Sequence, residues 1–209
     1  MVDDGERVPS PEETLRLIEE QQAATVRRFR GDPLFMYVPW GVAWLVGFTC
    51  FFLHYGLDGK PYAPISQNQA LTVLMIFQLI AGSLCAYEIT RMNIGVRGDT
   101  TAKGAMYGYA WFAGMVVMSV IAIRVSPMLP EAESGLLWAG ISLLVVGVLY
   151  MTGGAIFLFW PMFFLGIGIS AVNGLGVLLG PGWHALLTAV LLGFGQIVVG
   201  LWLRRRRCP

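Results

Sequence analysis

Charged side chains are scarce in this sequence of 209 residues. Asp, Glu, Lys and Arg make up 13% of it and hydrophobic residues 56%, whereas soluble domains contain roughly 25% charged residues. This composition indicates an integral membrane protein. The 14 Lys and Arg residues nearly balance the 13 Asp and Glu residues. The chain therefore lacks the basic excess that nucleic-acid binding requires, and we expect no nucleic acid among its partners.

Cysteine is equally rare, and its spacing carries no motif. Cys50 and Cys85 lie in apolar stretches and Cys208 follows four arginines, so neither a disulfide framework nor a zinc site is predicted. A cleavable signal peptide is not expected either. The first residues, MVDDGERVPSPEE, are acidic and contain proline, whereas a signal peptide has a basic start and an apolar core. We expect the amino terminus to stay in the cytoplasm.

Ionisable side chains are almost absent from the apolar stretches, which argues against an enzyme. Glu88 lies three residues before Arg91, a spacing typical of a shallow pair within one helix. The two histidines fall at the ends of apolar stretches, where we expect interfacial side chains. No HxxxH, HxxE or paired-carboxylate spacing predicts a metal site or another cofactor. The side chains considered for a metal site are His54, His184, Asp58, Glu131 and Glu133.

Long apolar runs are what the sequence has in abundance. A helix needs about 20 apolar residues to cross a bilayer, and six segments reach or approach that length. They predict an all-α, polytopic membrane protein with six transmembrane helices, forming one domain at residues 34–203. The six segments are Leu34–Tyr55, Gln69–Thr90, Gly104–Val125, Gly135–Phe157, Pro161–Leu179 and Trp183–Leu203.

The distribution of Lys and Arg over the connecting segments predicts the orientation. Only Lys60 and Arg124 fall on one side of the membrane, which leaves twelve of the 14 on the side of the amino terminus. Lys and Arg accumulate on the cytoplasmic side of membranes. We therefore predict that both termini lie in the cytoplasm, and we expect the membrane to be a bacterial cytoplasmic (inner) membrane. Residues 204–209, which begin with RRRR, form a basic cytoplasmic tail.

Residues 1–33 are predicted to form a cytoplasmic amino-terminal segment with an amphipathic helix. Ser10 can cap this helix, Pro11 suits its first position and Glu13 completes a capping box. The helix either lies on the inner membrane surface or packs beneath the bundle, and docking to a membrane-protein partner is the alternative. Its apolar face consists of Leu15, Ile18, Val26 and Phe29.

Neutral polar residues and glycines occupy the last two helices. Six glycines and Asn173 lie within Leu165–Gly182, and Gln196 lies between glycines in GFGQIVVG, residues 193–200. Missing glycine side chains let helices approach closely, and an amide in hydrocarbon needs a partner. One interpretation is tight packing with hydrogen bonds between helices. The other is a cavity whose few donors and acceptors bind the hydroxyl or ester group of a lipid.

The second interpretation predicts a lipid site among the second, fifth and sixth helices. Residues three, four and seven positions apart share a helical face. Such faces are formed by Gly166, Ser170, Asn173 and Gly174 on the fifth helix and by Gly193, Gln196 and Gly200 on the sixth. The candidate lipid-binding residues are Gln78, Ser170, Asn173, Gly174 and Gln196.

Six spans with short loops, a glycine-rich fifth span and a final GFGQIVVG segment followed by basic residues resemble the Insig (insulin-induced gene) family and its prokaryotic homologues. The resemblance implies a non-enzymatic membrane protein that binds sterols or related lipids between its helices. The expected ligand is sterol-like or a glyceride, and the expected assembly is a homo-oligomer. The alternative is a small transporter or permease subunit that conducts as an oligomer. The amphipathic helix and the RRRR tail depart from the family.

Overall fold

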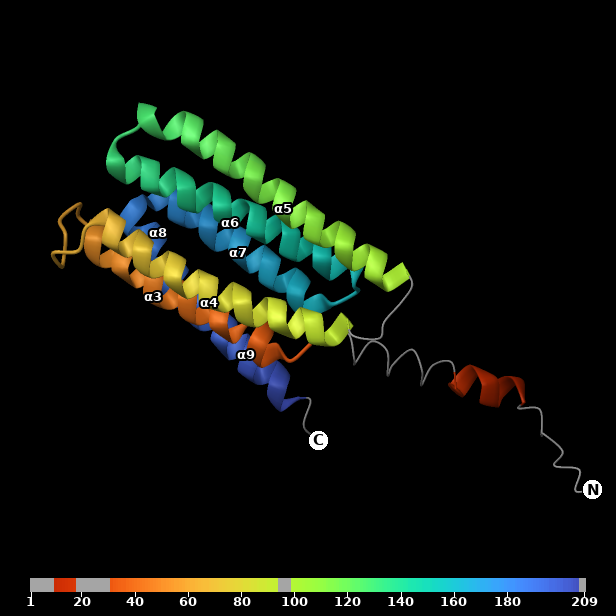
Figure 1. Cartoon of the computed structure of the whole chain (residues 1–209). Coiled ribbons are helices and arrows are strands. Elements are labelled where there is room, and N and C mark those ends of the chain that lie inside the picture. The colour runs from red at the N-terminus through yellow and green to blue at the C-terminus, as the bar shows by residue number, and fades with distance from the viewer. Residues whose placement is uncertain (1–9, 18–30, 94–98, 207–209) are drawn as a thin grey trace, which may run out of the picture.

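The computed structural model describes residues 10–17, 31–93 and 99–206 (Figure 1). Within these ranges the chain forms helices and no strand. Six of the helical stretches are long and apolar enough to cross a membrane. The predicted all-α fold with six transmembrane helices is therefore confirmed.

The spans are built from ten helical elements of the described chain. The first span joins α2 (Pro33–Met36) to α3 (Val38–Tyr55). The next four contain α4 (Gln67–Asn93), α5 (Asp99–Val125), α6 (Glu131–Ile156) and α7 (Trp160–Leu179), with a short 3-10 turn at Ser126–Met128 after α5. The sixth span consists of α8 (Pro181–Leu187), a π-helical segment at Thr188–Phe194 and α9 (Gly195–Arg205).

Successive spans run in opposite directions, so the bundle has two ends (Figure 1). We call the end that holds Pro33 and Arg205 the terminal end, and the end that holds Tyr55, Glu131 and Pro181 the distal end. Helices α7 and α8 meet at the distal end with a single residue between them. That residue is Gly180, whose φ of 97° is a backbone conformation open chiefly to glycine.

The buried core lies between the first, second, fourth, fifth and sixth spans. Helix α5 supplies no residue to this cluster and, among the described helices, packs extensively only on α6. The Tyr107 hydroxyl of α5 donates to the Leu149 carbonyl oxygen of α6 at 2.8 Å. The third span is thus peripheral. The cluster consists of Ala43, Trp44, Phe48, Leu74, Ala81, Leu143, Val146, Ile169, Ala185, Ala189 and Leu192.

The amino-terminal helix is described at residues 11–17. The Glu13 N–H donates to Ser10 Oγ at 3.1 Å, so Ser10 caps this helix as predicted. Leu15 and Leu17 are exposed. The other residues of the predicted apolar face, Ile18, Val26 and Phe29, lie outside the described ranges.

Candidate functional site

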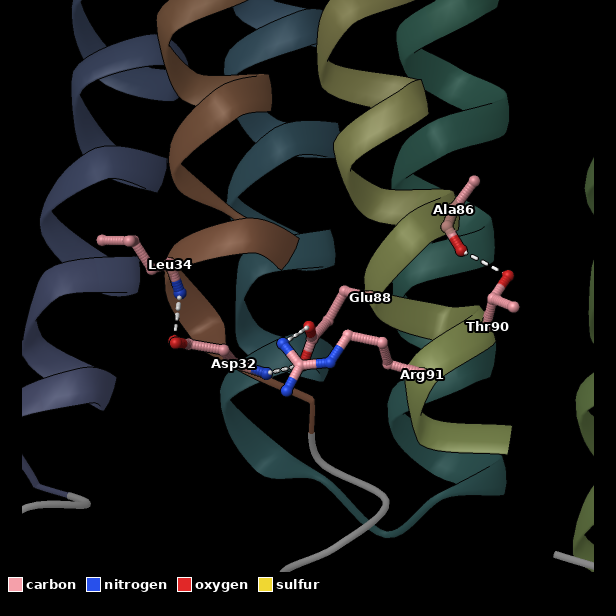
Figure 2. Close-up of polar contacts among 6 residues, drawn as sticks. All are labelled: Asp32, Leu34, Ala86, Glu88, Thr90 and Arg91. Atoms are coloured by element: carbon pink, nitrogen blue, oxygen red, sulfur yellow. Dashed lines mark hydrogen bonds and ion pairs between the residues drawn. The ribbon is translucent and has the colours of Figure 1, made fainter. Parts of the chain in front are cut away.

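At the terminal end, Glu88 joins the first two spans (Figure 2). Its Oε1 accepts a hydrogen bond from the Asp32 N–H at 2.8 Å, and its Oε2 lies 3.7 Å from Arg91 Nη1. Asp32 in turn accepts from the Leu34 N–H and caps α2. The predicted Glu88–Arg91 pair is confirmed. Glu88 is only 7% exposed, and the bond from Asp32 offsets part of the cost of burying its carboxylate. This carboxylate positions the start of the first span.

Asn173 links three helices in the distal half of the bundle. Its Nδ2 donates to the Gly140 carbonyl oxygen of α6 at 2.8 Å, and its Oδ1 lies 2.9 Å from His184 Nε2 on α8. An amide oxygen can only accept, so His184 carries its proton on Nε2. Both polar atoms of the Asn173 side chain therefore have a partner within the protein.

His184 corrects the prediction that both histidines are interfacial. It lies near the start of the sixth span as expected, but it is 2% exposed and faces Asn173. The close approach of α7 and α8 places it there: a Cβ on Gly176 would come within 2.9 Å of the His184 Cα. His54 is half-buried and its Nδ1 lies 2.7 Å from the Ile65 carbonyl oxygen.

Thr188 begins the π-helical segment of the sixth span, and Gln196 lies two residues beyond the end of that segment. Both side chains are 0% exposed. Among the described residues, neither polar atom of the Gln196 amide nor the Thr188 hydroxyl has a hydrogen-bond partner. Buried polar groups are normally paired, and unpaired ones call for an explanation. π-helical turns occur often at functional sites, and the sequence carries no signal that would have predicted this one.

Of the residues on the predicted glycine face of the fifth span, some pack against α6 and one is exposed. A Cβ on Gly166 would lie 2.6 Å from the Met151 nitrogen, so α6 and α7 touch at backbone level. Ser170 Oγ donates to the Gly166 carbonyl oxygen in its own helix at 3.0 Å. Gly174 is exposed, and a Cβ there would have no neighbour within 4 Å. At 3.6 residues per turn, Gly174 is rotated by roughly 80° from Gly166.

The predicted face of the sixth span is buried throughout. Gly193 approaches the backbone of Leu45 in α3, and Gly200 approaches Val38 in the same helix. Gln196 lies between these two glycines in sequence and is buried with them. The first and sixth spans are therefore in close contact along this face.

The five predicted site residues do not meet at one depth. At about 1.5 Å per residue, Asn173 lies about 9 Å from the distal end of its span, and Gln196 roughly 20 Å from the distal end of its own. Gln78 is half-buried near the middle of α4, where the structure gives it no hydrogen bond to another described residue. The two amides therefore occupy separate polar sites.

A pocket of about 350 Å³ opens at the distal end. We call it the distal pocket. It is bounded by the end of α3 and the loop that follows, by the first turn of α6 and by the turn between α7 and α8, and it includes none of the five predicted residues. No group of three or more potential metal ligands occurs in the described part of the chain. The side chains that give the pocket its character are His54, Tyr55, Glu131, Glu133, Leu179 and Trp183.

The contact between Asn173 and His184 could have been predicted from the sequence. Asn173 and His184 lie on either side of the Gly180–Gly182 turn, and a turn this tight brings the end of one helix beside the start of the next. Their pairing follows from that hairpin.

Comparison of the chain with protein families, curated proteins and solved structures finds no match.

Proposed function

We propose that this integral membrane protein binds a neutral lipid, sterol-like or a glyceride, between its helices and catalyses no reaction. The Insig resemblance implies the same function. The observation that carries the proposal is the Gln196 amide, which is fully buried with neither polar atom hydrogen-bonded to a described residue.

An unpaired amide within hydrocarbon costs several kcal/mol, so a ligand that pairs with it binds favourably. A lipid hydroxyl offers both a donor and an acceptor, and an ester offers an acceptor. Thr188, equally buried and unpaired, adds a second neutral hydroxyl on the same span. Neutral groups of this kind suit a neutral lipid better than a charged one.

The sixth span also supplies a route by which a lipid reaches Gln196. Helices α3 and α9 touch closely on this face, so a ligand must separate them. The π-helical segment at Thr188–Phe194 ends two residues before Gln196, and its hydrogen bonds skip one residue more than those of an α-helix. A return to α-helical bonding shifts α9 by one residue relative to α8, which rotates Gln196 relative to the first span.

Native mass spectrometry of the detergent-purified protein tests this proposal. We expect a co-purifying neutral lipid, and we expect Gln196→Met to lower its occupancy about fivefold, which corresponds to roughly 1 kcal/mol for one hydrogen bond. Gln78→Met is the matched control, because it makes the same chemical change at a half-buried position of another span. Equal occupancy in wild type and Gln196→Met would refute the proposal. The spectra also report whether the protein is the homo-oligomer predicted from the sequence.

The proposed orientation places both termini in the cytoplasm and the distal end on the periplasmic side of the inner membrane. In a background without the native cysteines, a cysteine at Asp58 should react with a membrane-impermeant maleimide in intact cells. A cysteine at Lys103 should react only after permeabilisation. The opposite pattern would reverse the orientation without affecting the lipid site.

A further inference from the structure

We propose that the distal pocket binds an organic ammonium group, such as a protonated amine. This site is separate from the lipid site at Gln196 and does not depend on it. The pocket volume of about 350 Å³ falls in the range of small-molecule sites and is far larger than a single metal ion requires. Its lining chemistry identifies the class of ligand.

The charges at the pocket are negative. Glu131 and Glu133 lie in the first turn of α6 and line it, and neither forms an ion pair with a described basic residue. The two basic residues at this end, Lys60 and Arg124, do not belong to the lining. An anion would meet two carboxylates there and no lysine or arginine side chain, whereas a cation would be attracted.

His54 adds a hydrogen-bond acceptor to the pocket. Its Nδ1 lies 2.7 Å from the Ile65 carbonyl oxygen, and a carbonyl can only accept, so the ring proton is on Nδ1. In the neutral ring Nε2 then carries a lone pair. An ammonium group has donors and no acceptors, and it therefore complements the two carboxylates and Nε2.

Aromatic rings complete the match to an organic cation. Tyr55 and Trp183 both line the pocket. Tyr55 stacks on Phe51, whereas Trp183 is exposed, and the face of an exposed indole attracts ammonium groups through cation–π interactions. Leu179 and Pro181 provide apolar surface beside them. A bare metal ion would use neither the rings nor this surface, whereas an organic amine uses both together with the carboxylates.

Binding measured on the full-length protein in nanodiscs of phosphatidylglycerol tests the site. One arm titrates ethanolamine, and the other replaces part of the lipid with phosphatidylethanolamine and measures its enrichment around the protein. Saturable binding in the first arm identifies a soluble amine as sufficient, and enrichment in the second arm alone identifies a lipid headgroup. Failure of both arms overturns the proposal, as does stronger binding of Mg²⁺ than of the amine.

Charge-neutralising variants separate the pocket from the general negative field. We expect Glu131→Gln combined with Glu133→Gln to weaken amine binding about tenfold, in line with two ion pairs at exposed carboxylates. Asp58→Asn is the control, because it removes the same charge from an exposed neighbour outside the lining, and it should change affinity by less than about twofold. Equal weakening in both variants would contradict a built site.

Gln196→Met distinguishes the two proposals. It should leave amine binding at wild-type strength while lowering neutral-lipid occupancy. The Glu131→Gln, Glu133→Gln double variant should do the reverse. Loss of both activities in either variant would indicate a folding defect common to both sites, and thermal unfolding of each variant measures that directly.

Discussion

Asn173 and Gln196 are two buried amides on adjacent spans, and they have opposite surroundings. Asn173 pairs both polar atoms with the protein, across α6 and α8. Gln196 is more deeply enclosed and pairs neither atom with a described residue. The same kind of side chain thus connects helices by hydrogen bonds in one part of the bundle and has no hydrogen-bond partner among the described residues in another.

The difference arises from what the neighbouring helices present. Around Asn173 a neighbouring carbonyl at Gly140 and a histidine on the next helix lie within hydrogen-bond reach. Around Gln196 the close neighbour is α3, whose backbone bonds are used within its own helix. Close approach of two helices at a glycine therefore does not by itself satisfy a buried polar side chain. The neighbouring helix must also present a free hydrogen-bond donor or acceptor.

Replacing Asn173 should have the largest effect on stability. Asn173→Leu removes two hydrogen bonds between helices and leaves the buried His184 without its partner, so we expect a loss of about 3 kcal/mol in unfolding free energy. Reversible unfolding in mixed micelles measures this. A loss below about 1 kcal/mol would mean that the pair contributes little to the bundle.

His184 should come next, because its removal leaves the Asn173 oxygen unpaired. We expect His184→Ala to cost about 2 kcal/mol and His54→Ala clearly less, since His54 is only half-buried. The Asn173→Leu, His184→Ala double variant should cost less than the sum of the two single variants, because both remove the same bond. Strict additivity would show that the two side chains act independently.

The number of spans and their limits follow from hydropathy, because an apolar run of span length has to be helical in a membrane. The Ser10 cap and the Glu88–Arg91 pair also follow, since both depend only on local spacing. The position of Gly174 does not, although it lies within the same apolar run as Gly166. Which glycine faces a neighbouring helix depends on how α7 is rotated about its axis relative to α6, and hydropathy does not predict that rotation.

The surroundings of Gln196 and His184 are equally hidden from the sequence. Inserting a π-helical turn leaves the apolar character of the sixth span unchanged, yet it alters which residues face α3. The burial of His184 depends on the tertiary contact between α7 and α8. Predicting both requires knowing the helix pairing, and residue patterns within one span specify only its own faces.

Glycine substitutions test how much the close packing of α6 against α7 contributes to stability. A Cβ on Gly166 would meet the Met151 backbone at 2.6 Å, so Gly166→Ala should cost about 2 kcal/mol through overpacking. Gly174→Ala is the matched control on the same helix, because its Cβ would meet nothing within 4 Å. It should leave stability unchanged. Equal losses in the two variants would place both glycines in packing contacts.

Gln196 should respond with the smallest change and the opposite sign. Gln196→Met keeps the length of the side chain and removes an unpaired buried amide, and such a replacement is neutral or stabilising. We expect a gain of about 1 kcal/mol in lipid-depleted micelles. When neutral lipid is supplied, binding to the folded wild type stabilises it in turn, so the advantage of the variant should shrink or vanish. A gain that persists at every lipid concentration would show that Gln196 is an unsatisfied packing residue. A loss in lipid-depleted micelles would show that the protein itself supplies its partner, and the contrast with Asn173 would disappear.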